Sequence, residues 1–186
     1  MHDVAFGELM LAVIVPAMLY ACWSDLRHHR VPNWLNAVML ATGLSAQMTY
    51  GGWSGLAEGL LGVSVGFGLL AVLWAIKGMG AGDVKFMAAI GAWLGPQSTF
   101  YAVLAGGLAG GVIALGMIAY QRNWRQASTN LGILMVKVST IKTAFSEFGS
   151  AKSMSHATSV LPYAVPLSLG TLVVLVSEYF GWWEVL

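Results

Sequence analysis

Charged residues are scarce in this 186-residue sequence, because only 9% are Asp, Glu, Lys or Arg while 58% are hydrophobic. A soluble domain usually carries about 25% charged residues. The composition therefore excludes a chain that meets water on all sides, and the length suits a single domain. The net charge of +1 gives no indication of nucleic-acid binding, so we expect no nucleic-acid partner.

Cysteine is nearly absent, since Cys22 is the only one. A single cysteine excludes an intrachain disulfide and a paired C-x-x-C metal site. The histidines at 28, 29 and 156 are the remaining metal candidates, but two of them stand beside arginines in an expected interfacial loop, where histidine is usually solvated. We expect no metal and no cofactor.

Basic residues are missing from the first ten positions, which carry Asp3 and Glu8 instead. A signal peptide needs a basic start and a small-residue cleavage site. We therefore expect Phe6–Trp23 to be a membrane helix that is retained.

Long apolar runs are abundant, and six of them approach the roughly 20 residues that a helix needs to cross the hydrocarbon. They are Phe6–Trp23, Trp34–Tyr50, Leu56–Ile76, Val84–Leu94, Thr99–Tyr120 and Val160–Phe180. The fourth is short unless it continues past Gly95-Pro96. The pattern predicts an all-α fold: a polytopic membrane helix bundle of about six transmembrane helices, forming one membrane-embedded domain over residues 1–186.

The distribution of charge predicts the orientation of these spans. If six spans alternate, all nine basic residues fall on one side: Arg27, Arg30, Lys77, Lys85, Arg122, Arg125, Lys137, Lys142 and Lys152. The opposite side holds only acids: Asp3, Glu8, Glu58, Glu178 and Glu184. Basic loops stay in the cytoplasm, so we expect both termini to be extracytoplasmic. An odd number of spans would break this separation, which favours counting the fourth.

Tryptophan and glycine add detail to the bundle. All eight tryptophans lie near predicted span ends, as an interfacial aromatic belt requires. Three G-x-x-x-G pairs, at 62/66, 106/110 and 107/111, place small residues where helix backbones can approach closely. We interpret these pairs as packing within the bundle, and a homo-oligomer interface is the alternative left open.

Two aspartates lie at span ends on the predicted cytoplasmic side. Asp25 ends the first span, and Asp83 follows a glycine-rich stretch and begins the fourth. Two carboxyl groups that share a site hold one proton between them near working pH. Such a pair suits peptide hydrolysis, because one group takes a proton from water while the other polarises the carbonyl and protonates the leaving amine.

Each aspartate also has a structural interpretation. Asp25 could be a surface residue paired with Arg27 or Arg30, and Asp83 could cap a helix N-terminus. The alternating glycines before Asp83 do not have the spacing of a dinucleotide or P-loop motif. Lys85 stands two residues beyond Asp83 and should not face it on a helix, so we expect its side chain to reach the membrane interface.

The sequences around the two aspartates contain recognisable motifs. Gly80-Ala81-Gly82-Asp83-Val84-Lys85 resembles the G-x-G-D motif of the type IV prepilin peptidase family, whose members are membrane aspartyl proteases. Asp25-Leu26-Arg27 followed by Val31-Pro32-Asn33 is similar to the other catalytic region of that family. The likeness covers most of residues 20–120 and the last span. It implies that Asp25 and Asp83 are catalytic. It also implies substrate-binding or motif-supporting roles for Gly80, Gly82, Lys85, Pro32 and Asn33.

The resemblance implies a substrate as well. It would be a prepilin or pseudopilin with a short basic leader, cut after a glycine at the cytoplasmic face of a bacterial inner membrane. Larger members of the family carry paired C-x-x-C motifs for zinc and also N-methylate the new N-terminus. This sequence has one cysteine, and it resembles the short peptidase-only form of Tad/Flp-type pilus systems, so we expect no methyltransferase activity.

Two further expectations concern the longest connection and the rival function. The connection over about 121–159 has apolar residues at three- and four-residue steps, which predicts an amphipathic helix along the inner surface. The rival function is a small proton-coupled membrane transporter, which six spans and paired acids would also suit. Many carriers show internal symmetry. The second half of this sequence does not repeat the first, which argues against the transporter.

Overall fold

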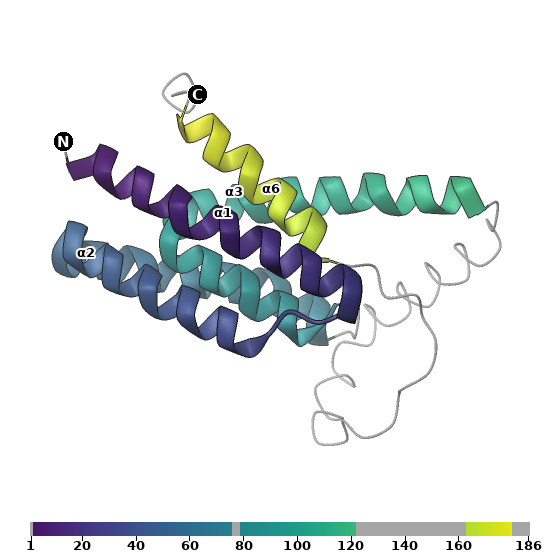
Figure 1. Cartoon of the computed structure of the whole chain (residues 1–186), viewed down its shortest axis with the longest axis horizontal. Helices are drawn as coiled ribbons and strands as arrows, with labels where there is room; N and C mark the ends of the chain where they lie inside the picture. Colours follow the sequence, from purple (N-terminus) through teal and green to yellow (C-terminus); the bar gives the residue numbers. More distant parts are fainter. Residues whose placement is uncertain (1, 76–78, 122–162, 180–186) are drawn as a thin grey trace.

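The computed structural model describes residues 2–75, 79–121 and 163–179 of the chain. The described residues form four helical elements, α1 (His2–His28), α2 (Asn33–Ala75), α3 (Ala81–Gln121) and α6 (Ala164–Tyr179), shown in Figure 1. The all-α prediction is confirmed for these residues. The predicted amphipathic connection beyond Gln121 lies outside them.

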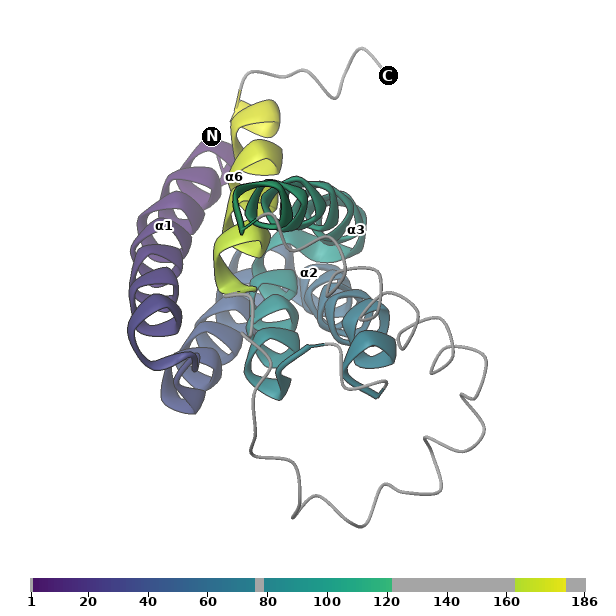
Figure 2. The ribbon, with the colours of Figure 1, turned by 90° about the vertical axis from the view of Figure 1, so that its right-hand side faces the viewer.

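Both long elements contain a glycine at which the helix is interrupted. Gly52 in α2 has φ 61° and ψ −145°, and Gly95 in α3 has φ 75° and ψ 177°. A positive φ is readily adopted only by glycine. The space beside Gly59 is filled by the side chain of Leu44, so the two parts of α2 lie side by side and the chain doubles back at Gly52. The two views of the ribbon show the same reversal (Figures 1 and 2).

The doubling back gives each part of α2 a length suited to a membrane. Residues 33–51 and 53–75 span about 28 and 34 Å at the rise of an α-helix, against a hydrocarbon core of about 30 Å. Gly95 likewise separates residues 81–94 from 96–121 in α3. Both turning points fall in gaps between the predicted spans, at Gly51–Gly55 and at Gly95-Pro96.

Apolar residues cover the outside of the bundle as well as its core. Three helical stretches, Ala5–His28, Asn33–Ala75 and Ala81–Met117, are long and apolar enough to cross a membrane. Large apolar side chains such as Leu108 and Val112 are exposed. An exterior of this kind is compatible with lipid and unfavourable in water, so the chain has the character of an integral membrane protein.

Glycine lets the helices approach until their backbones touch. Gly62 faces the backbone of Gly91, and a Cβ at Gly66 would lie 2.6 Å from the Met87 carbonyl oxygen. Gly106 packs in the same way against Leu167 of α6. The prediction of packing within the bundle is therefore confirmed for the 62/66 and 106/110 pairs. It is wrong for Gly107 and Gly111, which face open space because they lie on the other side of α3.

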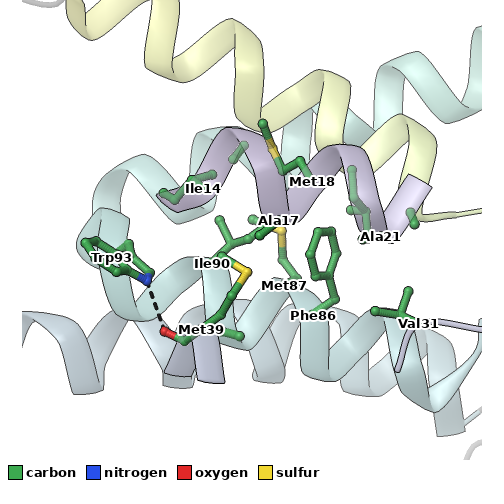
Figure 3. Close-up of a cluster of buried hydrophobic side chains, with 14 of the residues drawn as sticks. Ile14, Ala17, Met18, Ala21, Val31, Met39, Phe86, Met87, Ile90 and Trp93 are labelled. Atoms are coloured by element: carbon green, nitrogen blue, oxygen red, sulfur yellow. Dashed lines mark hydrogen bonds between the residues drawn. The ribbon is translucent and has the colours of Figure 1, made fainter. Parts of the chain in front are cut away.

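The core lies where α1, α2 and the first part of α3 meet (Figure 3). Ile14, Ala17 and Met18 of α1 belong to one buried cluster with large residues of α3, among them Phe86 and Met87. Trp93 is 2% exposed, and its indole N–H donates to the Met39 carbonyl at 3.0 Å. The aromatic-belt prediction is therefore wrong for Trp93.

Other tryptophans behave as the belt prediction requires. Trp23 and Trp34 are exposed near helix ends, and Trp53 is exposed directly after the interruption at Gly52. Trp93 differs because a buried carbonyl is available to its N–H, and that carbonyl comes from a residue far away in the sequence.

The first helix is longer than its apolar run. The sequence predicts Phe6–Trp23, and α1 covers His2–His28. Hydropathy marks only the lipid-facing stretch, whereas backbone hydrogen bonds continue through the polar residues at the interface. Asp25 consequently lies inside the last turn of α1 and not at its end.

Candidate active site

Asp25 is held between α1 and the start of α6. Its side chain is 5% exposed, and Oδ2 accepts a hydrogen bond of 3.0 Å from the backbone N–H of Ala164. Ala164 begins α6, and the first N–H groups of a helix have no partner within it. The same helix end carries partial positive charge. Asp25 is therefore not the surface residue of the alternative interpretation, since both Arg27 and Arg30 are exposed while it is buried.

A tight turn after α1 returns the chain towards α3. His29 has φ 52°, and its N–H donates to the Asp25 carbonyl at 2.8 Å. The Ser24 hydroxyl donates to the Arg30 carbonyl, also at 2.8 Å. Val31 then lies against Gly82, where an added Cβ would be 3.5 Å from its backbone. The turn thus connects the two motifs in space.

Asp83 is the third residue of α3 and is 7% exposed. Its N–H donates to the Gly80 carbonyl at 3.2 Å, and its carboxyl group accepts a hydrogen bond from the Gly80 backbone. A Cβ at Gly80 would lie 3.0 Å from Asp83 Oδ2, so glycine leaves room for the carboxyl group. The Asp83 carboxyl group thus accepts from the residue before the helix, as the acid of a capping box does, and Gly80, not Asp83, is the N-cap residue.

The two carboxyl groups share one neighbourhood. Asp83 lies within electrostatic range of Asp25, and Tyr163, just before α6, lies within range of Asp83. His29 lies within range of Asp25 from the other side. Capping explains why an acid stands at each position, but it does not explain why two buried acids face the same space. Paired ionisable groups in a membrane helix bundle indicate function by default.

The other predicted site residues lie in the two segments next to this pair. Gly80 and Gly82 precede Asp83, Asn33 is the first residue of α2, and Pro32 stands directly before it. Lys85 is exposed, and its ammonium group donates to Asn33 Oδ1 at 3.3 Å. The structure therefore joins the two motifs through a Lys85–Asn33 contact. Substrate binding by these residues stays a prediction.

Three contributors to the site were not among the predicted site residues. They are the N–H of Ala164, the side chain of Tyr163 and the buried amide of Asn36, whose Nδ2 donates to the Gly82 carbonyl at 3.3 Å. Asn36 carried a usable signal, because a polar residue one turn after Asn33 in an apolar helix is costly unless it has a role. The residue type at position 164 carried no such signal, because Ala164 contributes its backbone N–H and not its side chain.

A hollow of about 440 Å³ on the described part of the surface lies away from this site. It lies between α1 and α2 and is lined by residues that include Leu9, Val13, Tyr50 and Trp93. Those residues belong to the end of the bundle with the Gly52 and Gly95 turns, opposite the aspartates. The described parts of the chain contain no group of three potential metal ligands, and His156 lies outside them.

A sequence model described as the type IV leader peptidase family matches residues 12–115. The prepilin leader peptidase/N-methyltransferase of Aeromonas salmonicida is 31% identical over 129 residues, which is 66% of this chain. The protein of the same description from Xanthomonas campestris is 34% identical over 115 residues, or 58% of this chain. No solved structure matches.

This chain matches different shares of the length of each relative. The chain spans 44% of the Aeromonas protein and 39% of the Xanthomonas protein, less than half of each. The leader peptidase HopD of Escherichia coli is 33% identical over 118 residues, which is 54% of this chain and 74% of HopD. The family match at 12–115 contains both Asp25 and Asp83.

Proposed function

The chain belongs to the type IV leader peptidase family, and on that premise we propose that it is a membrane aspartyl endopeptidase. It removes the short basic leader from prepilins or pseudopilins, cutting after a glycine. The observation that carries this proposal is the burial of Asp25 and Asp83 within electrostatic range of each other at one end of the helix bundle.

The proposed reaction uses the two carboxyl groups as one unit with a single proton. The ionised carboxylate takes a proton from a water molecule, whose oxygen attacks the scissile carbonyl carbon. The protonated partner donates to the carbonyl oxygen, and the C–N bond then breaks as the leaving nitrogen takes up a proton. The carboxyl group that accepted the proton from water supplies it. The partner carboxylate takes a proton back from a hydroxyl of the tetrahedral intermediate as the new carboxyl group forms, so the pair returns to its starting state.

The same proposal includes a topology. Six spans are obtained if α2 and α3 each cross twice, with Gly52 and Gly95 in the outer turns and both termini extracytoplasmic. Asp25 and Asp83 are then at the cytoplasmic interface of a multi-pass inner-membrane protein, where a basic leader would present its cut site. The charge distribution and the positions of the two interrupting glycines support this arrangement.

The proposal is restricted to leader removal. The relatives named as N-methyltransferases are matched over less than half of their length, whereas HopD, named as a leader peptidase alone, is matched over 74%. Methyl transfer is therefore not carried over to this chain.

The proposed function is tested by co-expressing the chain with a pilin precursor in a bacterial host that lacks its own prepilin peptidase. We expect the wild type to shorten the precursor, with the new N-terminus directly after the leader glycine in mass spectrometry. A precursor with lysine in place of that glycine is the matched control and should remain uncut. Leader removal that survives both Asp25→Ala and Asp83→Ala would end the proposal.

The proposed topology predicts which positions react with a membrane-impermeant thiol reagent in a Cys22→Ala background. Single cysteines at His29 and Ala81, both exposed near the aspartates, should react only after the inner face is opened. Single cysteines at Ser54 and Gln97, exposed beyond the two outer turns, should react in intact spheroplasts. Labelling of positions 29 and 81 from opposite faces would contradict a shared site.

A further inference from the structure

Asn36 is a buried polar residue beside the aspartates that the proposed chemistry does not use. It is 5% exposed, and Nδ2 donates to the Gly82 carbonyl, one residue before Asp83. Its Oδ1 is fully buried and is the only side-chain polar atom among the described residues that combines burial with the lack of a hydrogen-bond partner. Buried acceptors are nearly always paired, so this exception needs an explanation.

The orientation of the amide follows from its partner. A carbonyl oxygen can only accept, so the group that faces Gly82 must be the NH₂ end of Asn36. Turning the amide over would bring two acceptors together and would not pair Oδ1. The unpartnered atom is therefore an oxygen, and what it lacks is a donor.

A second buried amide in α2 shows what an ordinary structural role looks like. Gln47 donates from Nε2 to the Trp93 carbonyl at 3.0 Å. Trp93 lies just before the interruption at Gly95, where the last carbonyls of a helix have no partner within it. Gln47 thus satisfies a carbonyl that the helix leaves free. The Gly82 carbonyl differs, because it stands in the first turn of α3, where carbonyls accept the N–H four residues ahead.

The bond from Asn36 to Gly82 is therefore not required to satisfy the backbone. Its effect is to fix the backbone that carries Asp83 against the start of α2. Asn36 N–H also donates to the Pro32 carbonyl at 3.4 Å, so the residue is tied to the turn that follows Asp25. The Asn36 side chain thus ties the segment that carries Asp83 to the first turn of α2, and that turn follows the loop after Asp25.

We propose that Asn36 is a positioning residue of the peptidase site, which holds Asp83 through Gly82 and offers its Oδ1 to a backbone N–H of the bound substrate. The second role follows because an extended peptide that enters a buried site must find acceptors for its N–H groups. The inference rests on the proposed function, since it names what the same site does with its substrate.

The test compares Asn36→Leu with Gln47→Leu, two changes that each replace a buried amide of α2 by an apolar side chain. Purified proteins in detergent are assayed on a pilin precursor for kcat and KM, and thermal unfolding is followed in parallel. We expect Asn36→Leu to lower kcat about 10- to 100-fold and to raise KM, while Gln47→Leu lowers the unfolding temperature and keeps kcat within about twofold.

Asn36→Asp separates positioning from packing. It keeps the shape and an acceptor, but its ionised form has no donor for the Gly82 carbonyl. Protonation restores an O–H donor, so the kcat of this variant, measured where its unfolding temperature shows it to be folded, should recover as the pH is lowered, relative to the wild type. A purely structural role would not change the pH profile in this way.

The outcomes are distinguishable. A wild type that cuts, aspartate variants that do not, and an Asn36→Leu variant whose kcat matches that of Gln47→Leu would overturn the inference alone. A wild type that leaves the precursor intact would overturn the inference and the proposed function together.

Discussion

Replacing Asp25 or Asp83 by asparagine lowers the rate of leader removal by at least about 10³-fold. The amide has the shape of the carboxyl group but neither takes a proton from water nor returns one to the leaving nitrogen. Asparagine is the informative choice because its Oδ1 can still accept the Ala164 N–H at position 25 and the Gly80 N–H at position 83. The helix starts should therefore remain intact.

The measurement is the initial rate of leader release from a pilin precursor, with the unfolding temperature of each variant as a check on folding. Glu178→Gln is the matched control, because Glu178 is a membrane acid at the opposite end of the bundle, where it accepts a hydrogen bond from Ser98. We expect that variant to cut within about twofold of the wild type. A folded Asp25→Asn or Asp83→Asn variant that cuts at the rate of Glu178→Gln would contradict the assignment of the pair.

Replacing Gly62 by leucine lowers the free energy of unfolding by about 3 kcal/mol, near the upper end of the usual cost of overpacking. Even a Cβ at this position would overlap the backbone of Gly91, which cannot rotate away as a side chain can. The second part of α2 would have to move away from the first part of α3, and the first part of α3 carries Asp83. Activity should fall together with stability.

Gly107→Leu is the matched control for this change, since a Cβ at Gly107 meets nothing within 4 Å. Leucine is favoured over glycine in a helix by about 0.5–1 kcal/mol, so the control should be neutral or slightly stabilising. Denaturant titration in mixed micelles compares the two variants. Equal stability of the two leucine variants would show that the contact between Gly62 and Gly91 does not hold the helices together.

Much of the fold could be predicted because its signals are local. Apolar runs mark the helices, and Gly51–Gly55 and Gly95-Pro96 mark the places where α2 and α3 double back. Glycines four residues apart indicated the close contact at Gly62 and Gly66. The ends of α1 were harder, because helical hydrogen bonding continues into polar residues that hydropathy does not count.

The neighbourhood of the two aspartates could be predicted only in outline. Alternating spans bring residues 25 and 83 to one side of the membrane, but they do not indicate which groups contact them. The partner of Asp25 is a backbone N–H 139 residues away, at the start of another helix. The burial of Trp93 and the role of Asn36 were not predicted for the same reason. Their hydrogen-bond partners, the Met39 and Gly82 carbonyls, belong to other helices.

The most direct test of the central claim, that Asp25 and Asp83 act as one catalytic unit, is the rate of the double variant Asp25→Asn/Asp83→Asn. A single-turnover assay with enzyme in excess gives measurable rates for slow variants. Residues that act as a unit show strongly non-additive losses, so the double variant should be no slower than the slower single variant. Losses that multiply, to about 10⁶-fold if each single change costs about 10³-fold, would show two independent contributions and would contradict the account.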